Sequence, residues 1–201
     1  MQAVGGENKV ALCGRVQSPA VRSHETGDKT FYRLSVAIRR HSGAEDVLGI
    51  LAERDHLLPE CFLPGARICI EGQLRSHNER TEGTNRLLLN VLALSMLAED
   101  RPDDNSVLLE GVLCKPPIFR RTPLGREICD ILLAVGRRYG RCDYLPCIAW
   151  GACARQVSKL GVGDRIKLTG RMQSRTYIKD LGTCCEERVA YEVSASSVDM
   201  P

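Results

Sequence analysis

The sequence predicts an all-β protein that consists of two tandem five-stranded barrels, each with one short helix. Two observations lead to this fold class: stretches in which apolar and polar residues alternate, and a repeat of the same segments in both halves. A chain of 201 residues, of which 43% are hydrophobic, is long enough for two domains with ordinary cores. We expect a first domain at residues 1–98, an acidic linker at 99–104 and a second domain at 105–201.

The repeat consists of four pairs of similar segments that occur in the same order in each half. The pairs are NKVALCGRV (8–16) with NSVLLEGVL (105–113), LSVAIRR (34–40) with LLAVGRR (132–138), GARICIEGQLRS (65–76) with GDRIKLTGRMQS (163–174), and NRLLLNVLALSML (85–97) with ERVAYEVSASSVD (187–199). Because they span nearly the whole chain, a duplicated fold explains them better than chance does.

Each unit is expected to consist mainly of strands. In the segment RIKLTGRMQSR, the residues Ile166, Leu168 and Met172 alternate with polar residues, which is typical of a strand with one buried face. Glycines recur inside the strand segments, where they usually mark a bulge, a sharp bend or a close approach of two backbones. Small barrels need such bends to close. These glycines are Gly14, Gly72, Gly111 and Gly170.

Only one segment per unit has a helical pattern. It is GACARQVSKLGVG (151–163) in the second unit and the shorter, proline-interrupted AERDHLLPECFLPG (52–65) in the first. Both segments lie between the expected third and fourth strands. Five strands with a helix at this place are the plan of the OB fold, a small barrel whose face binds oligonucleotides.

The charge is distributed unevenly along the chain. Residues 105–201 contain fifteen Lys and Arg residues against ten Asp and Glu residues, whereas residues 8–98 contain twelve against ten. The linker EDRPDD contains one against four. The second half is therefore the more basic half, which favours an anionic ligand there.

The ten cysteines are expected to be reduced structural thiols. Five of them lie inside apolar alternations, where cysteine behaves as a small hydrophobic residue; these are Cys13, Cys69, Cys114, Cys129 and Cys147. The nearest candidates for a zinc site lack the paired CxxC spacing; these are Cys142, Cys147 and Cys153, and the adjacent Cys184 and Cys185. We therefore expect no metal and no other cofactor.

The sequence also predicts a cytoplasmic protein. No apolar run approaches the roughly 20 residues that a membrane-spanning helix needs, and the N-terminal segment MQAVGGENKV has no signal-peptide core.

The second unit contains NSVLLEGVLCKPPIFRRTPLG, LLAVGRR, DYLPCIAWGACA, KLGVGDRIKLTGRMQSRTY and YEVSA. In these segments it resembles the bacterial single-stranded DNA-binding proteins and, more loosely, their relative, the primosomal replication protein. The first unit resembles them more weakly, through NKVALCGRV, GARICIEGQLRS and its last strand. The resemblance implies a nucleoid-associated protein that binds single-stranded DNA without cofactor or catalysis in replication, recombination or repair.

The resemblance further implies four aromatic positions that stack bases. Tyr139 follows the second strand, Tyr144 and Trp150 begin and end the third strand, and Tyr177 ends the fourth. Stacking on a ring contributes about 1–3 kcal/mol per base and tolerates any base sequence. Cations near these rings would contact phosphates; the candidates are Arg120, Arg121, Arg137, Arg138, Arg171, Arg175 and Lys179. Two alternatives stay open: Trp150 as a core residue, and the arginines as an ordinary solvated face.

The first unit lacks rings at the four corresponding positions, which are His41, Val47, Glu53 and Glu79. Two of these residues are acidic and would repel phosphate. We therefore expect the first unit to be a scaffold that pairs barrels, within the chain or in a homo-oligomer, as a dimer of tandem barrels. Weak phosphate contacts from its cations stay open; these are Arg39, Arg40 and Arg75. Phe31 and Tyr32 lie within the second strand and could equally be core residues.

Two other function classes can be compared with the sequence. An enzyme is not expected, because the four histidines are scattered over the first unit and no motif with a catalytic mechanism accompanies them. The alternative is a primosome-like adaptor whose barrels chiefly bind protein partners. The resembling family commonly has an acidic C-terminal tail that recruits replication and repair proteins. This sequence ends in SSVDMP directly after the last expected strand, so we do not expect recruitment by that route.

Overall fold

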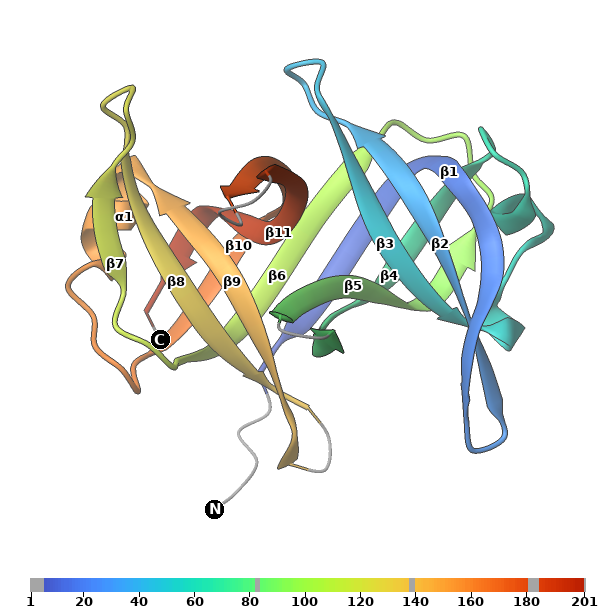
Figure 1. The fold of residues 1–201 in the computed structure, drawn as a ribbon, viewed down its shortest axis with the longest axis horizontal. Helices are drawn as coiled ribbons and strands as arrows, with labels where there is room; N and C mark the ends of the chain where they lie inside the picture. The colour runs from blue at the N-terminus through green and yellow to red at the C-terminus, as the bar shows by residue number, and fades with distance from the viewer. Residues whose placement is uncertain (1–5, 82–83, 138–139, 181–184, 201) are drawn as a thin grey trace.

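The computed structural model describes residues 6–81, 84–137, 140–180 and 185–200. Within these ranges, eleven strands form two closed barrels that lie side by side (Figure 1). The predicted fold class, two tandem OB barrels, is confirmed. The core is one continuous cluster of buried apolar side chains to which both barrels contribute.

The first barrel contains five strands, and β1 closes it by pairing with both β2 and β4. The strands are β1 (Asn8–Thr26), β2 (Lys29–Arg39), β3 (Glu45–Glu53), β4 (Arg67–Thr81) and β5 (Thr84–Leu97). Around the barrel their order is β1, β2, β3, β5 and β4. The β3–β5 pair is parallel, and its neighbours in the barrel are antiparallel.

The second barrel repeats this topology. Its strands are β6 (Asp104–Leu113), β7 (Ile118–Arg121), β8 (Glu127–Gly136), β9 (Cys142–Trp150), β10 (Arg165–Asp180) and β11 (Cys185–Asp199). Around the barrel the order is β6, β8, β9, β11 and β10, and β6 closes the barrel by pairing with β8 and β10. The short strand β7 extends the sheet beyond β8.

The two helical segments differ from the expectation. The helix α1 (Gly151–Val157) is shorter than predicted, because the sequence pattern extended it to residue 163. The prediction of a helix in the first unit was wrong. Two 3₁₀ turns take its place, η1 (Arg54–His56) and η2 (Pro59–Phe62). Proline fits only the first turn of a helix because it lacks an N–H donor, so Pro59 begins a new turn instead of continuing one.

Glycines in the fourth strand of each barrel allow a close backbone approach. A Cβ atom added at Gly72 would lie 2.3 Å from the Leu92 carbonyl oxygen, and one at Gly170 would lie 2.2 Å from that of Ser194. Both glycines coincide with a register shift between the fourth and fifth strands. The predicted role of these glycines as close-approach positions in a bent strand is confirmed.

The repeated asparagine at the start of each unit has a structural role. The Asn8 side chain donates to the Leu74 carbonyl oxygen at 2.9 Å and accepts from the Leu74 N–H at 2.8 Å. Asn105 makes the same two bonds with Met172, at 2.8 and 2.9 Å. Each asparagine thus satisfies the backbone N–H and carbonyl groups of one residue just beyond the register shift. This role explains why the asparagine recurs in the two units.

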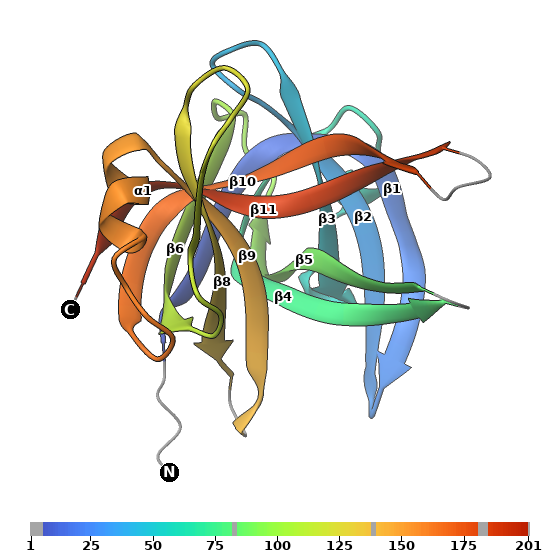
Figure 2. The same cartoon turned by 60° about the vertical axis from the view of Figure 1, so that its left-hand side comes forward.

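The two barrels are joined by a strand pair that the sequence did not predict. The first part of β1 pairs with β6 in an antiparallel register from Asn8 opposite Leu109 to Cys13 opposite Asp104. The two barrels therefore share one sheet of eleven strands. Figure 2 shows that the β4–β5 and β10–β11 hairpins extend to the same side of the molecule.

The expectation of reduced thiols was wrong at two positions. Cys13 and Cys69 lie directly opposite each other on β1 and β4 and form a disulfide. Among the described residues, Cys61, Cys114, Cys129, Cys142, Cys147 and Cys153 are free. Burial raises the pKa of the Cys114 and Cys129 thiols, which makes them poor nucleophiles. No helix in the described ranges is long and apolar enough to cross a membrane.

Candidate nucleic-acid interface

Three residues of the second barrel form a row across neighbouring strands. Arg120 on β7 lies opposite Ile128 on β8, and Ile128 lies opposite Trp150 on β9. Residues opposite each other in an antiparallel pair project to the same face of a sheet. The core residues Cys129 and Ala149 flank this row along β8 and β9 and point into the barrel. The row therefore lies on the face of the sheet that points away from the barrel core, where Ile128 is buried between its two neighbours at 1% exposure.

Trp150 is held in place on this outer face. Its side chain is half-buried, and its Nε1–H donates to the Ser194 Oγ on β11 at 3.0 Å. It is absent from the core cluster of the described residues, which argues against the alternative of a core tryptophan. A ring that is fixed along one edge and accessible elsewhere suits stacking of a flat ligand.

Arg120 and Arg121 both take part in ion pairs on the protein surface. Arg120 donates to the two carboxylate oxygens of Asp130 at 2.5 and 3.1 Å, and this pairing raises its pKa. Arg121 donates to Glu127 at 3.2 Å, and Glu127 also accepts from Arg155. Exposed ion pairs contribute only about 0–1 kcal/mol, so a phosphate can replace these carboxylates at little cost.

Tyr144 lies on the same strand and face as Trp150 but at the other end. It is 48% exposed, and the two positions are six residues apart, which corresponds to roughly 20 Å along a strand. Its backbone N–H donates to the Ser76 Oγ of the first barrel at 2.8 Å. The two rings could therefore contact different nucleotides of one strand, but not the same base.

Four of the predicted binding residues lie wholly or partly outside the part of the chain that the structure describes. Arg138 and Tyr139 lie outside the described residues, and Tyr177 and Lys179 lie on β10 with side chains outside them. Arg175, on the same strand, is exposed, and no described residue pairs with its guanidinium. The roles of these five residues stay predictions.

Arg137 lies in a partly buried cluster between the barrels, which we call the Asp143 clamp (Asp143, Arg75, Arg137 and Ser76). The carboxylate of Asp143 on β9 is 0% exposed. It accepts from Arg137 Nε at 2.5 Å, from Arg75 Nη1 at 3.1 Å and from the Ser76 N–H at 2.6 Å. Arg137 also donates to the Ser76 carbonyl oxygen at 3.0 Å. A carboxylate of the second barrel thus binds β4 of the first.

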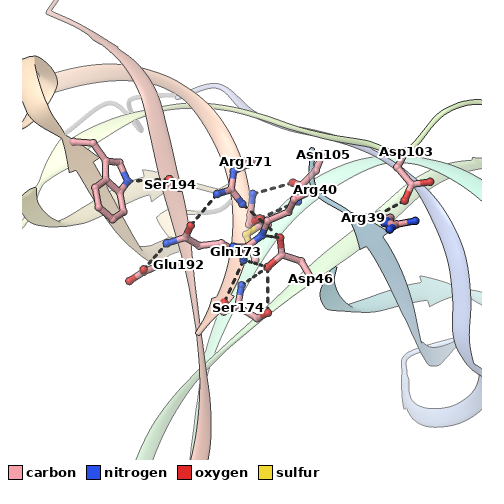
Figure 3. A network of polar contacts seen from close by, with 12 residues as sticks. Arg39, Arg40, Asp46, Asp103, Asn105, Arg171, Gln173, Ser174, Glu192 and Ser194 are labelled. Atoms are coloured by element: carbon pink, nitrogen blue, oxygen red, sulfur yellow. Dashed lines mark hydrogen bonds and ion pairs between the residues drawn. The ribbon is translucent and has the colours of Figure 1, made fainter. Parts of the chain in front are cut away.

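Arg171 belongs to a matching cluster, the Asp46 clamp (Asp46, Arg40, Arg171 and Ser174). Asp46 on β3 is also 0% exposed and accepts from Arg40 Nε at 2.6 Å and from the Ser174 N–H at 2.8 Å. Arg171 Nη1 lies 3.4 Å from its carboxylate. Figure 3 shows Asp46 between Arg40 and Ser174, with Gln173 linking Arg171 to Glu192 beyond it.

The two clamps correspond in the duplicated fold. Arg40 and Asp46 are each 97 positions before Arg137 and Asp143, so Arg40, and not Arg39, corresponds to Arg137. Ala37 and Ala134 hold the same position in the strand pairing of their barrels. The alignment of LSVAIRR with LLAVGRR is therefore wrong by one residue. An arginine six residues before an aspartate in both halves was the sequence signal for these clamps.

The Asp46 clamp predicts an acid-dependent stability. Burial alone would raise the pKa of Asp46, but hydrogen bonds from Arg40 and the Ser174 N–H outweigh it, so the pKa lies below its ordinary value of 3.8. A carboxyl with a lowered folded-state pKa stabilises the protein above the unfolded pKa and loses this effect as the pH falls through the folded one. Wild type is therefore expected to be more stable than Asp46→Asn near neutral pH, and the difference should shrink below about pH 4.

Urea unfolding of both proteins between about pH 6 and pH 2 measures this difference. A difference that stays constant over that range would contradict the assigned pKa direction.

The second half of the chain is similar to a family of known proteins. Residues 104–201 match the Single-strand binding protein family. Single-stranded DNA-binding protein A of Bacillus subtilis is 34% identical over 102 residues, which cover 47% of this chain and 57% of that protein. Single-stranded DNA-binding protein 1 of Lactococcus lactis is 32% identical over 85 residues, covering 39% and 57%. The chain spans about half the length of the curated relatives that it matches.

A solved structure resembles the whole chain. The crystal structure of the wild-type single-stranded DNA binding protein from Thermus aquaticus superposes with a TM-score of 0.77. The match covers 98% of this chain and 94% of that one, at 24% sequence identity. The fold is therefore shared over both barrels.

Proposed function

Through residues 104–201 this chain belongs to the Single-strand binding protein family, and from this premise we propose that the outer face of its second barrel binds single-stranded DNA. Bases stack on Trp150 and Tyr144, and guanidinium groups such as Arg120 and Arg175 contact the phosphates. Membership in a family of binding proteins also confirms the expectation that the chain is not an enzyme.

The observation that carries the proposal is the placement of Trp150. Its indole is anchored to Ser194 on the outer face, and it shares a cross-strand row with Arg120. A fixed ring beside a cation supports both parts of sequence-independent recognition, which are stacking of the base and attraction of the phosphate. Arg137 and Arg171 act differently in this proposal, because they hold the barrels together through the clamps.

A role in replication, recombination or repair is part of the proposal, as is a homo-oligomer of tandem barrels. The β1–β6 pair already brings two barrels together within one chain. Association of two chains stays a prediction.

Titration of the full chain with oligo-dT tests the function. The chain contains one tryptophan, so indole fluorescence reports on Trp150 alone. We expect the fluorescence to be quenched, and the logarithm of the binding constant to fall linearly with the logarithm of salt, by about 0.7 per phosphate contacted. A duplex of the same length should bind more weakly. Equal binding of both forms, or of neither, would contradict the proposal and favour the adaptor.

A further inference from the structure

A cavity of about 370 Å³ lies between the first barrel and the linker, which in the structure runs from residue 98 to residue 103 between β5 and β6. The sheet side of the cavity is formed by β1, β4 and β5. Cys13 and Cys69, which form the disulfide, both line the cavity. Neither belongs to the core cluster of the described residues. The disulfide therefore lies at a concave surface beneath the linker.

The disulfide is the middle of a row of residues that crosses four strands. Cys69 on β4 lies opposite Leu97 on β5, and Cys13 on β1 lies opposite Asp104, the first residue of β6. The preceding residue Leu12 belongs to the core cluster, so the row projects away from the core. The disulfide thus lies where the linker enters the second barrel.

Two arginines hold the linker over the disulfide. Arg67 Nη2 on β4 donates to the Asp103 carboxylate at 2.8 Å and also to the Arg101 carbonyl oxygen. The backbone N–H of Arg39 donates to the other carboxylate oxygen of Asp103 at 2.6 Å (Figure 3). The Arg101 carbonyl oxygen lies 3.9 Å from Cys13 Sγ. The linker therefore covers the cavity from one side.

The charges around the cavity favour one class of reductant. Among the described residues that line it are three carboxylates and one guanidinium, which belong to Glu71, Asp103, Asp104 and Arg101. This excess of negative charge repels an anionic thiol but not a small neutral one. Cys69 is 9% exposed and Cys13 is 3% exposed, so Cys69 is the more accessible of the two.

We propose that the Cys13–Cys69 disulfide is a reversible redox site that a small neutral thiol reduces in the folded protein. A first thiolate attacks Cys69 Sγ, which forms a mixed disulfide and releases Cys13 as a thiolate. A second thiolate attacks the mixed disulfide at the sulfur of the bound thiol and releases Cys69. Two thiols are thereby oxidised to one disulfide, and the two protons that they lose are bound by Cys13 and Cys69.

Reduction of this site is expected to weaken the first barrel without changing its fold. The disulfide joins residues 56 positions apart, and such a crosslink stabilises a protein mainly by restricting the unfolded chain. The β1–β4 pair continues on both sides of it, from Val10 opposite Gly72 to Arg15 opposite Arg67. The redox state thus sets the stability of the barrel and not its topology.

Trapping of free thiols in the full chain tests whether the site is accessible. The folded protein is incubated with 2-mercaptoethanol at about pH 8, near the pKa of a free thiol. The reagent is then removed in acid, and all free cysteines are alkylated in urea and identified by mass spectrometry. Cys13 and Cys69 should be labelled only after the thiol treatment, whereas the free Cys142 should be labelled with and without it.

Two of the possible results would overturn the site. Labelling of Cys13 and Cys69 without the thiol treatment would show that the disulfide is absent in solution. Protection of both residues in the presence of the thiol would show that the folded protein excludes the reductant.

Matched variants test whether the cavity is the route of the reductant. Ser95 is exposed and lines the cavity, so Ser95→Phe should slow reduction several-fold. Ser23→Phe changes an exposed serine on β1 that does not line the cavity and should leave the rate unchanged. At equal thiolate concentration, the anionic 2-mercaptoethanesulfonate should reduce wild type more slowly than 2-mercaptoethanol. Equal rates for both variants and both thiols would exclude the cavity as the route.

Urea unfolding measures the consequence for stability. Reduction should lower the urea midpoint of wild type by about 1–2 M. The variant Cys13→Ser with Cys69→Ser cannot form the crosslink, so its midpoint should be low with and without the thiol. An unchanged midpoint of reduced wild type would contradict the control of stability. Quenching of Trp150 by oligo-dT is a separate measurement, so the proposed function does not depend on this site.

Discussion

Replacement of Asp143 by alanine is expected to lower the free energy of unfolding by about 3–5 kcal/mol. The carboxylate is fully buried and accepts from two guanidinium groups and one backbone N–H. Its removal leaves Arg75 and Arg137 close together without a counter-charge and leaves the Ser76 N–H without its acceptor. Urea unfolding of the full chain at about pH 7 measures the loss.

An exposed ion pair provides the control for this variant. Arg22 Nη2 lies 2.6 Å from Glu25 Oε1, and both side chains are largely exposed. Arg22→Ala should therefore change the free energy of unfolding by less than about 1 kcal/mol. If Asp143→Ala unfolds at the same urea concentration as Arg22→Ala, the clamp contributes no net stability to the contact between the barrels.

Replacement of Trp150 by alanine is expected to weaken binding of single-stranded DNA about 5- to 150-fold, because one stacking platform of about 1–3 kcal/mol is lost. Trp150→Phe retains a ring and should lose less. Fluorescence anisotropy of a labelled oligo-dT measures both variants, since neither has an indole to observe. Trp150 lies outside the core cluster, so cooperative unfolding should be retained.

Phe62→Ala serves as the matched control, because it removes an exposed ring at a distance in sequence from the second barrel. Its affinity for oligo-dT should equal that of wild type. An equal loss in Trp150→Ala and Phe62→Ala would indicate a general effect of ring removal on the protein. No loss in Trp150→Ala would exclude the indole as a stacking platform.

The strands and their bends could be predicted from the sequence because both leave a local pattern. Alternation of apolar and polar residues places Leu168 and Met172 inside the barrel, where both are buried. Gly72 and Gly170 mark the bulges because no side chain fits there. The even separation of Tyr144 and Trp150 also predicts their shared face on one strand.

The clamps left no such pattern. Asp46 and Asp143 are charged residues at the beginning of a strand, which hydropathy places on the surface. Their burial depends on serines that lie 128 and 67 positions away in the sequence. Only the recurrence of the same arginine and aspartate spacing in both units indicates that these residues share a structural role.

The Phe31 ring of the first barrel also leaves no signal in an alignment of the two units. The first unit has Glu53 at the position of Trp150, so a position-by-position alignment contains no ring there. Phe31 lies 22 residues earlier and becomes its neighbour only when β2 and β3 pair. Substitutions that move a side chain to the facing strand preserve a surface but not an alignment.

The β1–β6 strand pair makes the contact between the two barrels independent of protein concentration. Contact between separate subunits obeys mass action and is lost on dilution below the dissociation constant. In this chain the peptide linkage tethers both partners, so their encounter is intramolecular and independent of how many copies a cell contains. Each of the two strands also covers an edge that could otherwise recruit a foreign strand and seed aggregation.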